Sequence, residues 1–149
     1  SISGFTIYSN YSLSYSNEDF TSGLTLGFNR YFGTHLFIQS EYFYNQNGLT
    51  TEEYDNLMPF EIPRHIKIGF TGRHYLYSTV QLTDAKENNM NFFSLVNPDW
   101  KTGLVGVSLS TGYFDNSLIL LNIIRIIKGR EFDYVPADNI LSLEFRYYF

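Results

Sequence analysis

The chain has 149 residues, a formal net charge of −5 and 17% charged residues, whereas aromatic residues make up 19%. The acidic balance argues against a nucleic-acid partner. Because the sequence has no cysteine, disulfides and cysteine-ligated metals are excluded, and we expect no metal or cofactor. The length suits a single domain, 1–149. No run approaches the roughly 18 apolar residues of a transmembrane helix, but strands that cross a bilayer bury only alternate residues and give a weak hydropathy signal.

The first third of the chain alternates apolar and polar residues in three stretches. Since successive side chains of a strand point to opposite faces, this pattern predicts strands with one apolar and one polar face. A polar loop at 16–21 and a tight turn at Gly33-Thr34 join them, and Glu41 falls on the polar face. The predicted strands are 3–15, 22–32 and 35–46.

A long acidic loop, 47–63, separates these strands from five further stretches. The run 117–128 is apolar on both faces, and its β-branched residues favour a strand over the competing helix. We place Arg125 on the polar face, which puts Asn122 on the apolar one. The predicted strands of this part are 65–82, 90–97, 102–114, 117–128 and 139–149.

The last stretch, Asn139 to Phe149, has the length of about 9–11 residues with which a tilted strand crosses a bilayer. Its polar face carries Glu144 and Arg146. Its apolar face consists of Leu141, Leu143, Phe145, Tyr147 and Phe149. This ending resembles the C-terminal signature of bacterial outer-membrane β-barrels. The resemblance implies that these five residues are an assembly signal read by the barrel-assembly machinery.

Eight strands joined as consecutive hairpins predict an all-β fold, a transmembrane antiparallel up-and-down β-barrel. A soluble lipocalin-like ligand carrier has a similar strand number and turns its apolar face inward. The lipocalin Gly-x-Trp motif near the start is absent from this sequence. We therefore favour the bacterial outer membrane, with outer-membrane lipids and lipopolysaccharide as surroundings.

From Gly72-Arg73-His74-Tyr75-Leu76 onward, through the Asp115-Asn116-Ser117-Leu118 hairpin to the final strand, the chain resembles the C-terminal part of porin-like outer-membrane proteins of Gram-negative bacteria. The resemblance implies passive transport, with these strands forming part of a wider wall and other membrane subunits as possible neighbours. A complete eight-stranded structural or surface-interaction barrel without a pore is the alternative.

Six charged residues are expected to face the lumen: Glu41, Lys67, Arg73, Arg125, Glu144 and Arg146. They would bias ion selectivity in a pore, or form a packed salt-bridge network in a narrow barrel. We expect no enzyme. An outer-membrane lipid hydrolase would need a nucleophile beside His65 or His74, and no His-x-Ser pair accompanies them.

Overall fold

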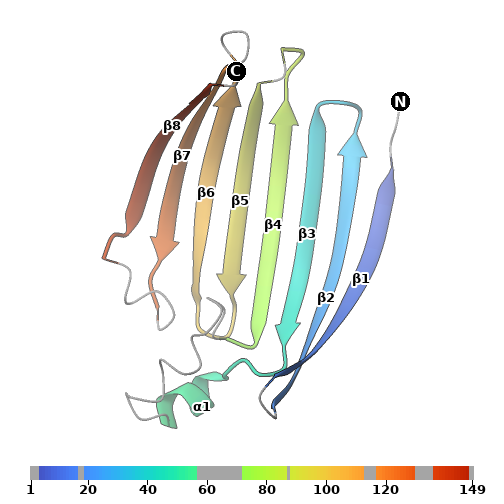
Figure 1. The fold of residues 1–149 in the computed structure, drawn as a ribbon, viewed down its shortest axis with the longest axis vertical. Coiled ribbons are helices and arrows are strands. Elements are labelled where there is room, and N and C mark those ends of the chain that lie inside the picture. Colours follow the sequence, from blue (N-terminus) through green and yellow to red (C-terminus); the bar gives the residue numbers. More distant parts are fainter. Residues whose placement is uncertain are drawn as a thin grey trace.

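The computed structural model describes residues 4–16, 19–56, 72–86, 88–112, 117–129 and 136–147. They form one eight-stranded sheet in which every strand pairs antiparallel with its neighbours in sequence (Figure 1). The strands are β1 (Phe5–Ser16), β2 (Asp19–Phe32), β3 (Leu36–Asn45), β4 (His74–Thr83), β5 (Asn89–Asn97), β6 (Thr102–Thr111), β7 (Ser117–Ile127) and β8 (Asn139–Tyr147). A short helix, α1 (Thr51–Asn56), lies beyond the strand ends, below β5 and β6 in Figure 1. Among the described residues, no helix has the length and apolarity to span a bilayer.

The predicted order of strands and hairpins is confirmed. At the turn after β2, Gly33 has the positive φ of 65° that glycine adopts without strain. Asp19 was expected in a loop but opens β2, because β1 and β2 stay paired up to Ser16 and Asp19. The predicted strand 65–82 is described only from Gly72 onward, and regular pairing begins at His74. Residues 65–71, with Lys67, lie outside the described residues.

The sheet is open. In the described part of the chain, β1 pairs with β2 alone and β8 with β7 alone. The two strands lie at opposite edges of the sheet (Figure 1). The prediction of an antiparallel up-and-down sheet of eight strands is thus confirmed, whereas the closed cylinder is not seen.

The strand register divides the side chains between two faces. We call the face that carries Ile7, Phe28 and Leu82 the apolar face, and the face that carries Tyr8, Glu41 and Thr79 the polar face. On the apolar face, large apolar residues pair across seven consecutive strands in one row: Phe32, Leu36, Leu82, Met90, Leu109, Leu121 and Leu143. This row fixes the phase of β4 to β8, because a slip of one residue would turn the apolar side chains of a strand to the other face.

The apolar face is the more exposed one. Except for Tyr31 and Ile140, every large apolar side chain that is exposed in the described residues lies on it, with Ile7 at 75% and Leu143 at 73%. The four residues Tyr75, Thr79, Asn97 and Thr102, all buried, lie on the polar face. The sheet therefore exposes one large apolar surface on one face, whereas its most buried side chains lie mainly on the other.

The expectation that Arg125 shares a face with Glu41 and Glu144 is wrong. Arg125 pairs with Val105 and Asn139 on the apolar face, near the end of β7. Asn122 instead lies on the polar face, where its Nδ2 donates to Ser142 Oγ at 3.1 Å. The register of β7 places Ile119, Leu121 and Ile123 in the rows of the apolar face, and Arg125 shares their side of the strand because it keeps the same alternation.

Candidate functional site

The polar face over β1 to β3 carries a hydrogen-bonded group around Glu41. The Tyr8 hydroxyl donates to Glu41 Oε1. Gln39 Nε2 donates to the same oxygen at 2.9 Å and to the Tyr8 hydroxyl at 3.0 Å. Glu41 is therefore held by neutral donors, and its charge has no cation among these partners.

Glycine allows aromatic rings to lie flat on the polar face. A Cβ on Gly27 would come within 2.5 Å of Tyr8 Cζ, so the absence of a side chain lets the tyrosine ring cross β2 towards β3. In the same way, a Cβ on Gly106 would lie 2.5 Å from Phe93 Cζ. These two rings follow the wall of the sheet and do not project away from it.

Further polar groups line β4 and β5. Thr79 donates to Asn91 Oδ1. Asn89 Oδ1 accepts from Thr83 Oγ1 at 2.6 Å and from Gln81 Nε2 at 3.2 Å. Chains of such bonds hold amide and hydroxyl groups in fixed positions. Hydrogen-bonded polar side chains therefore occur on the polar face from β1 to β5, interspersed with aromatic residues such as Phe43 and Phe93.

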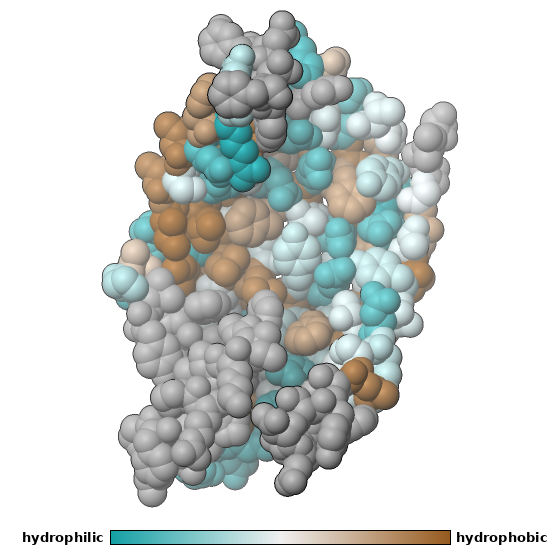
Figure 2. Space-filling model, viewed as in Figure 1, coloured by the Kyte–Doolittle hydropathy of each residue, from teal (hydrophilic) through white to brown (hydrophobic). Residues whose placement is uncertain are grey.

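Beyond β6 the polar face changes character. Figure 2 shows hydrophilic residues over its middle and its β1 side, and hydrophobic residues towards β7 and β8. The register assigns five apolar residues of the two strands to this part: Leu118, Leu120, Ile124, Ile126 and Ile140. The sequence run 117–128 was predicted to be apolar on both faces, and this is confirmed.

The predicted charges of the last strand neutralise each other. Arg146 Nε lies 2.6 Å from Glu144 Oε1, and Arg146 Nη2 lies 3.1 Å from Glu144 Oε2. Both side chains are on the polar face, as expected, opposite Leu118 and Leu120. An exposed pair of this kind contributes little stability, but it cancels two charges at one place.

Arg73 lies at the rim of the polar face and not within a strand. Its Nη2 donates to both carboxylate oxygens of Glu53 in α1, at 3.0 and 3.1 Å. Its Nε donates to the Gly48 carbonyl at 3.1 Å. Arg73 was predicted to face the lumen from within a strand. In the structure its hydrogen bonds instead connect the start of β4 to the loop that follows β3.

The N-terminus of α1 is stabilised by reciprocal hydrogen bonds between Thr50 and Glu53. The Thr50 N–H donates to Glu53 Oε2 at 2.7 Å, and the Glu53 N–H donates to Thr50 Oγ1 at 3.3 Å. This is the capping box that a threonine followed three residues later by glutamate predicts. The sequence therefore held a signal for α1, although the loop was expected to be irregular.

α1 packs against the turn between β5 and β6. The centroids of the Tyr54 and Trp100 rings are 5.0 Å apart, and Trp100 is buried. Asn97 Oδ1 accepts from the backbone N–H groups of Asp99 and Trp100. Three buried polar atoms of this turn have no hydrogen-bond partner: Asn97 Nδ2, Trp100 Nε1 and Thr102 Oγ1.

The two histidines of the described residues, His35 and His74, each have a hydrogen-bonding partner on a neighbouring strand. The Tyr42 hydroxyl lies 2.5 Å from His74 Nδ1, and Asp99 Oδ2 is 4.0 Å from His74 Nε2. These partners orient the ring but supply no serine. The His35 Nδ1 lies 2.8 Å from the Thr83 carbonyl. His65 lies outside the described residues. Among those described, no group of three or more His, Asp or Glu could hold a metal ion.

The residues of the expected assembly signal share the apolar face of β8. Leu141, Leu143, Phe145 and Tyr147 are all exposed, by 53–73% of their surface. Phe149 lies outside the described residues. Comparisons with protein-family models, curated proteins and solved structures find no match for this chain.

The α1 segment is expected to detach in acid. The Thr50 backbone N–H, followed by the Thr50 hydroxyl and Arg73, holds the pKa of Glu53 below its ordinary value of 4.5. A carboxyl group with a lowered pKa stabilises the folded state above that ordinary value and loses this contribution as the pH falls through the folded-state pKa. Trp100, the single tryptophan, reports the change through its contact with Tyr54. We expect its fluorescence to change in a transition below pH 4.5.

Glu53→Gln is the matched variant, since glutamine keeps the size of the side chain and removes its charge. We expect this variant to show the acid signal already at pH 7 and to lack the transition. Glu52→Gln, on the same helix, serves as the control and should keep it. If Glu53→Gln titrates like the original chain, Glu53 does not hold α1 in place.

Proposed function

We propose that the chain forms part of the wall of a bacterial outer-membrane β-barrel with a porin-like, passive transport role. The observation that carries this proposal is the division of the sheet into an exposed apolar face and a polar face. The apolar face then contacts lipid, and the polar face lines the lumen. The strands have 9–14 residues, which suits tilted strands in a bilayer.

Exposure of the apolar face to water would be costly. Apolar surface in water costs about 25 cal/mol per Å², and exposed large apolar side chains occur on every strand except β3. A lipid environment removes this cost without a further layer of protein. A soluble carrier instead needs the apolar face turned inward around a ligand, with β1 and β8 joined.

The open sheet favours a wide barrel. Unpaired backbone groups at the edges of β1 and β8 cannot remain unsatisfied in lipid, so each edge must pair with another strand. Tyr8 and Phe93 lie along the wall, which leaves space in front of the polar face. We therefore favour additional antiparallel strands between β8 and β1, from further wall segments or other membrane subunits.

One observation favours a closed eight-stranded barrel without a pore as the second candidate. Leu120, Ile124 and Ile126 lie on the polar face of β7, where water would fill a wide lumen. In an eight-stranded barrel the interior is just wide enough for side chains to fill, and these residues would pack there.

Planar-bilayer recordings of the folded full chain distinguish the candidates. The porin-like role predicts large ohmic current steps, whereas the closed barrel predicts none. Folding in water without detergent, together with failure to insert into vesicles, would contradict both and favour the soluble carrier.

The C-terminal strand serves as the assembly signal in both proposed membrane forms. Its truncation should therefore reduce insertion by the barrel-assembly machinery.

A further inference from the structure

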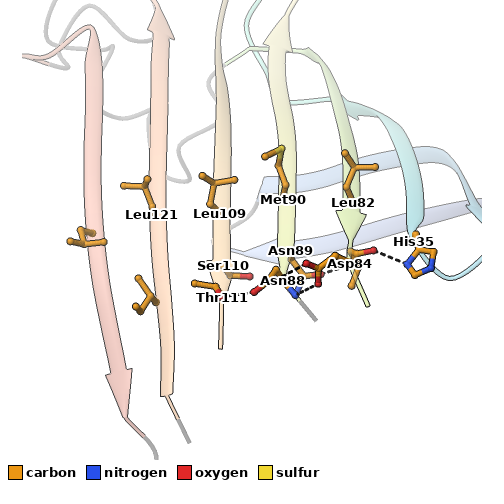
Figure 3. Close-up of a pocket in the computed structure, with 13 residues that line it drawn as sticks. His35, Leu82, Asp84, Asn88, Asn89, Met90, Leu109, Ser110, Thr111 and Leu121 are labelled. Atoms are coloured by element: carbon orange, nitrogen blue, oxygen red, sulfur yellow. Dashed lines mark hydrogen bonds between the residues drawn. The ribbon is translucent and has the colours of Figure 1, made fainter. Parts of the chain in front are cut away.

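A hollow of about 620 Å³ lies on the apolar face where β4 to β8 approach the β4–β5 turn. Its floor is the row of apolar side chains that runs across these strands, and Figure 3 shows four of them at one level. The floor residues are Leu82, Met90, Leu109, Leu121 and Leu143, with Ile119 beside them. A floor without hydrogen-bonding groups suits a hydrocarbon chain and no polar ligand.

Polar groups border this hollow at one end, where the strands meet the turn (Figure 3). Asp84 accepts from the Lys86 and Asn88 backbone N–H groups, at 2.7 and 2.9 Å, and from Asn88 Nδ2 at 2.7 Å. Thr111 Oγ1 in turn donates to Asn88 Oδ1 at 2.5 Å. The site thus has an apolar part that fits an acyl chain and, at one end of it, a polar part that fits a lipid headgroup.

The polar end is anionic with a cation beside it. The bonds from Asn88 hold the pKa of Asp84 below its ordinary value, so the carboxyl group is ionised at neutral pH. The Asp84 carboxylate is exposed and can accept a further hydrogen bond. Lys86 lies two residues further along the turn, and its charge acts on Asp84. A zwitterionic headgroup, with an ammonium for Asp84 and a phosphate for Lys86, matches this pair of charges. A purely anionic headgroup would be repelled by the Asp84 carboxylate.

We propose that this hollow is a binding site for one phospholipid with an ammonium headgroup, of the phosphatidylethanolamine class. An acyl chain lies along the row from Leu82 to Leu143, and the headgroup ammonium donates to the Asp84 carboxylate. The inference rests on the proposed membrane location, because only a lipid-facing surface meets such a ligand, but it does not depend on a pore.

Native mass spectrometry of the folded full chain in detergent tests the site, with dioleoyl phosphatidylethanolamine and dioleoyl phosphatidylglycerol added in equal amounts. We expect one phosphatidylethanolamine to be retained per chain, in about tenfold excess over phosphatidylglycerol, the ratio that one hydrogen bond to a charged group supplies. Equal retention of the two lipids, or an excess of phosphatidylglycerol, would overturn the headgroup assignment.

Two variants test the two parts of the site separately. Leu109→Trp fills the hollow and should abolish retention, whereas Leu26→Trp, on the apolar face of β2, should leave it unchanged. Asp84→Asn changes an exposed turn residue and should keep the acyl chain bound but remove the preference between the lipids. Unchanged retention by Leu109→Trp, or an unchanged preference in Asp84→Asn, would contradict the proposal. If Leu109→Trp fails to fold, Asp84→Asn still decides.

The same preparations separate this inference from the proposed function. Current steps in planar bilayers without a lipid preference would leave the porin-like role intact and refute the site. Retention of phosphatidylethanolamine by a chain that inserts but carries no current would refute the pore and support the site. A chain that fails to insert into vesicles removes the premise of both.

Discussion

If the apolar face contacts lipid as proposed, Val107→Arg should destabilise the protein in a bilayer by about 2–4 kcal/mol, the cost of an arginine on a lipid face near the middle of the bilayer. Val107 lies on the apolar face of β6, between Phe92 of β5 and Ile123 of β7. An arginine there has no carboxylate among these neighbours. Urea titration of the protein in lipid vesicles, followed by the Trp100 fluorescence, measures the loss.

Ser108→Arg is the matched control, because it introduces the same side chain one residue further along the same strand. Ser108 lies on the polar face opposite Asn91 and Asn122. If water fills the space in front of this face, the substitution should cost no more than about 1 kcal/mol, as for an ordinary surface change. Equal losses for the two variants would mean that both faces are enclosed in apolar surroundings. A larger loss for Ser108→Arg would assign the lipid to the other face.

The strands were predictable because each depends on a local alternation of apolar and polar residues. β3, β6 and β8 each keep one phase, and the structure begins them within one residue of the prediction. The phase of β7 was ambiguous, because it is apolar on both faces. Its phase is defined only by the pairing of Leu121 with Leu109 of β6 and Leu143 of β8. This pairing puts Leu121 on the apolar face, and Arg125, four residues later, lies on the same face. Such a register is a property of the whole sheet.

The contacts at the rim were less predictable, since they join residues far apart in sequence. The cap of Thr50 and Glu53 is local and leaves a pattern, but the bond from Arg73 to Gly48 spans 25 residues. Packing of Tyr54 on Trp100 likewise joins α1 to the turn between β5 and β6, which is distant in sequence. The alternation within β1 and β8 gives each strand its two faces but carries no information about a partner at the outer edge of either strand.

Glu41 is expected to set the ion selectivity of the proposed pore. Among the charged residues of β3 and β8 on the polar face, Glu144 and Arg146 form an ion pair, whereas Glu41 has the neutral partners Tyr8 and Gln39. A carboxylate without a cation favours the entry of cations into a lumen. Glu41→Gln should therefore lower the cation-to-anion permeability ratio severalfold, measured as a shift of the reversal potential across a potassium chloride gradient.

The last strand provides two comparison variants for this measurement. Glu144→Gln removes one negative charge from the polar face and should shift the reversal potential towards anions, in the same direction as Glu41→Gln. The double variant Glu144→Gln/Arg146→Gln removes a neutral pair and should leave it unchanged. The gradient should stay at or below about 0.1 M salt, where charges act over about 10 Å. A double variant that alters selectivity while Glu41→Gln does not would place the narrowest part of the pore beside β8 and away from β3.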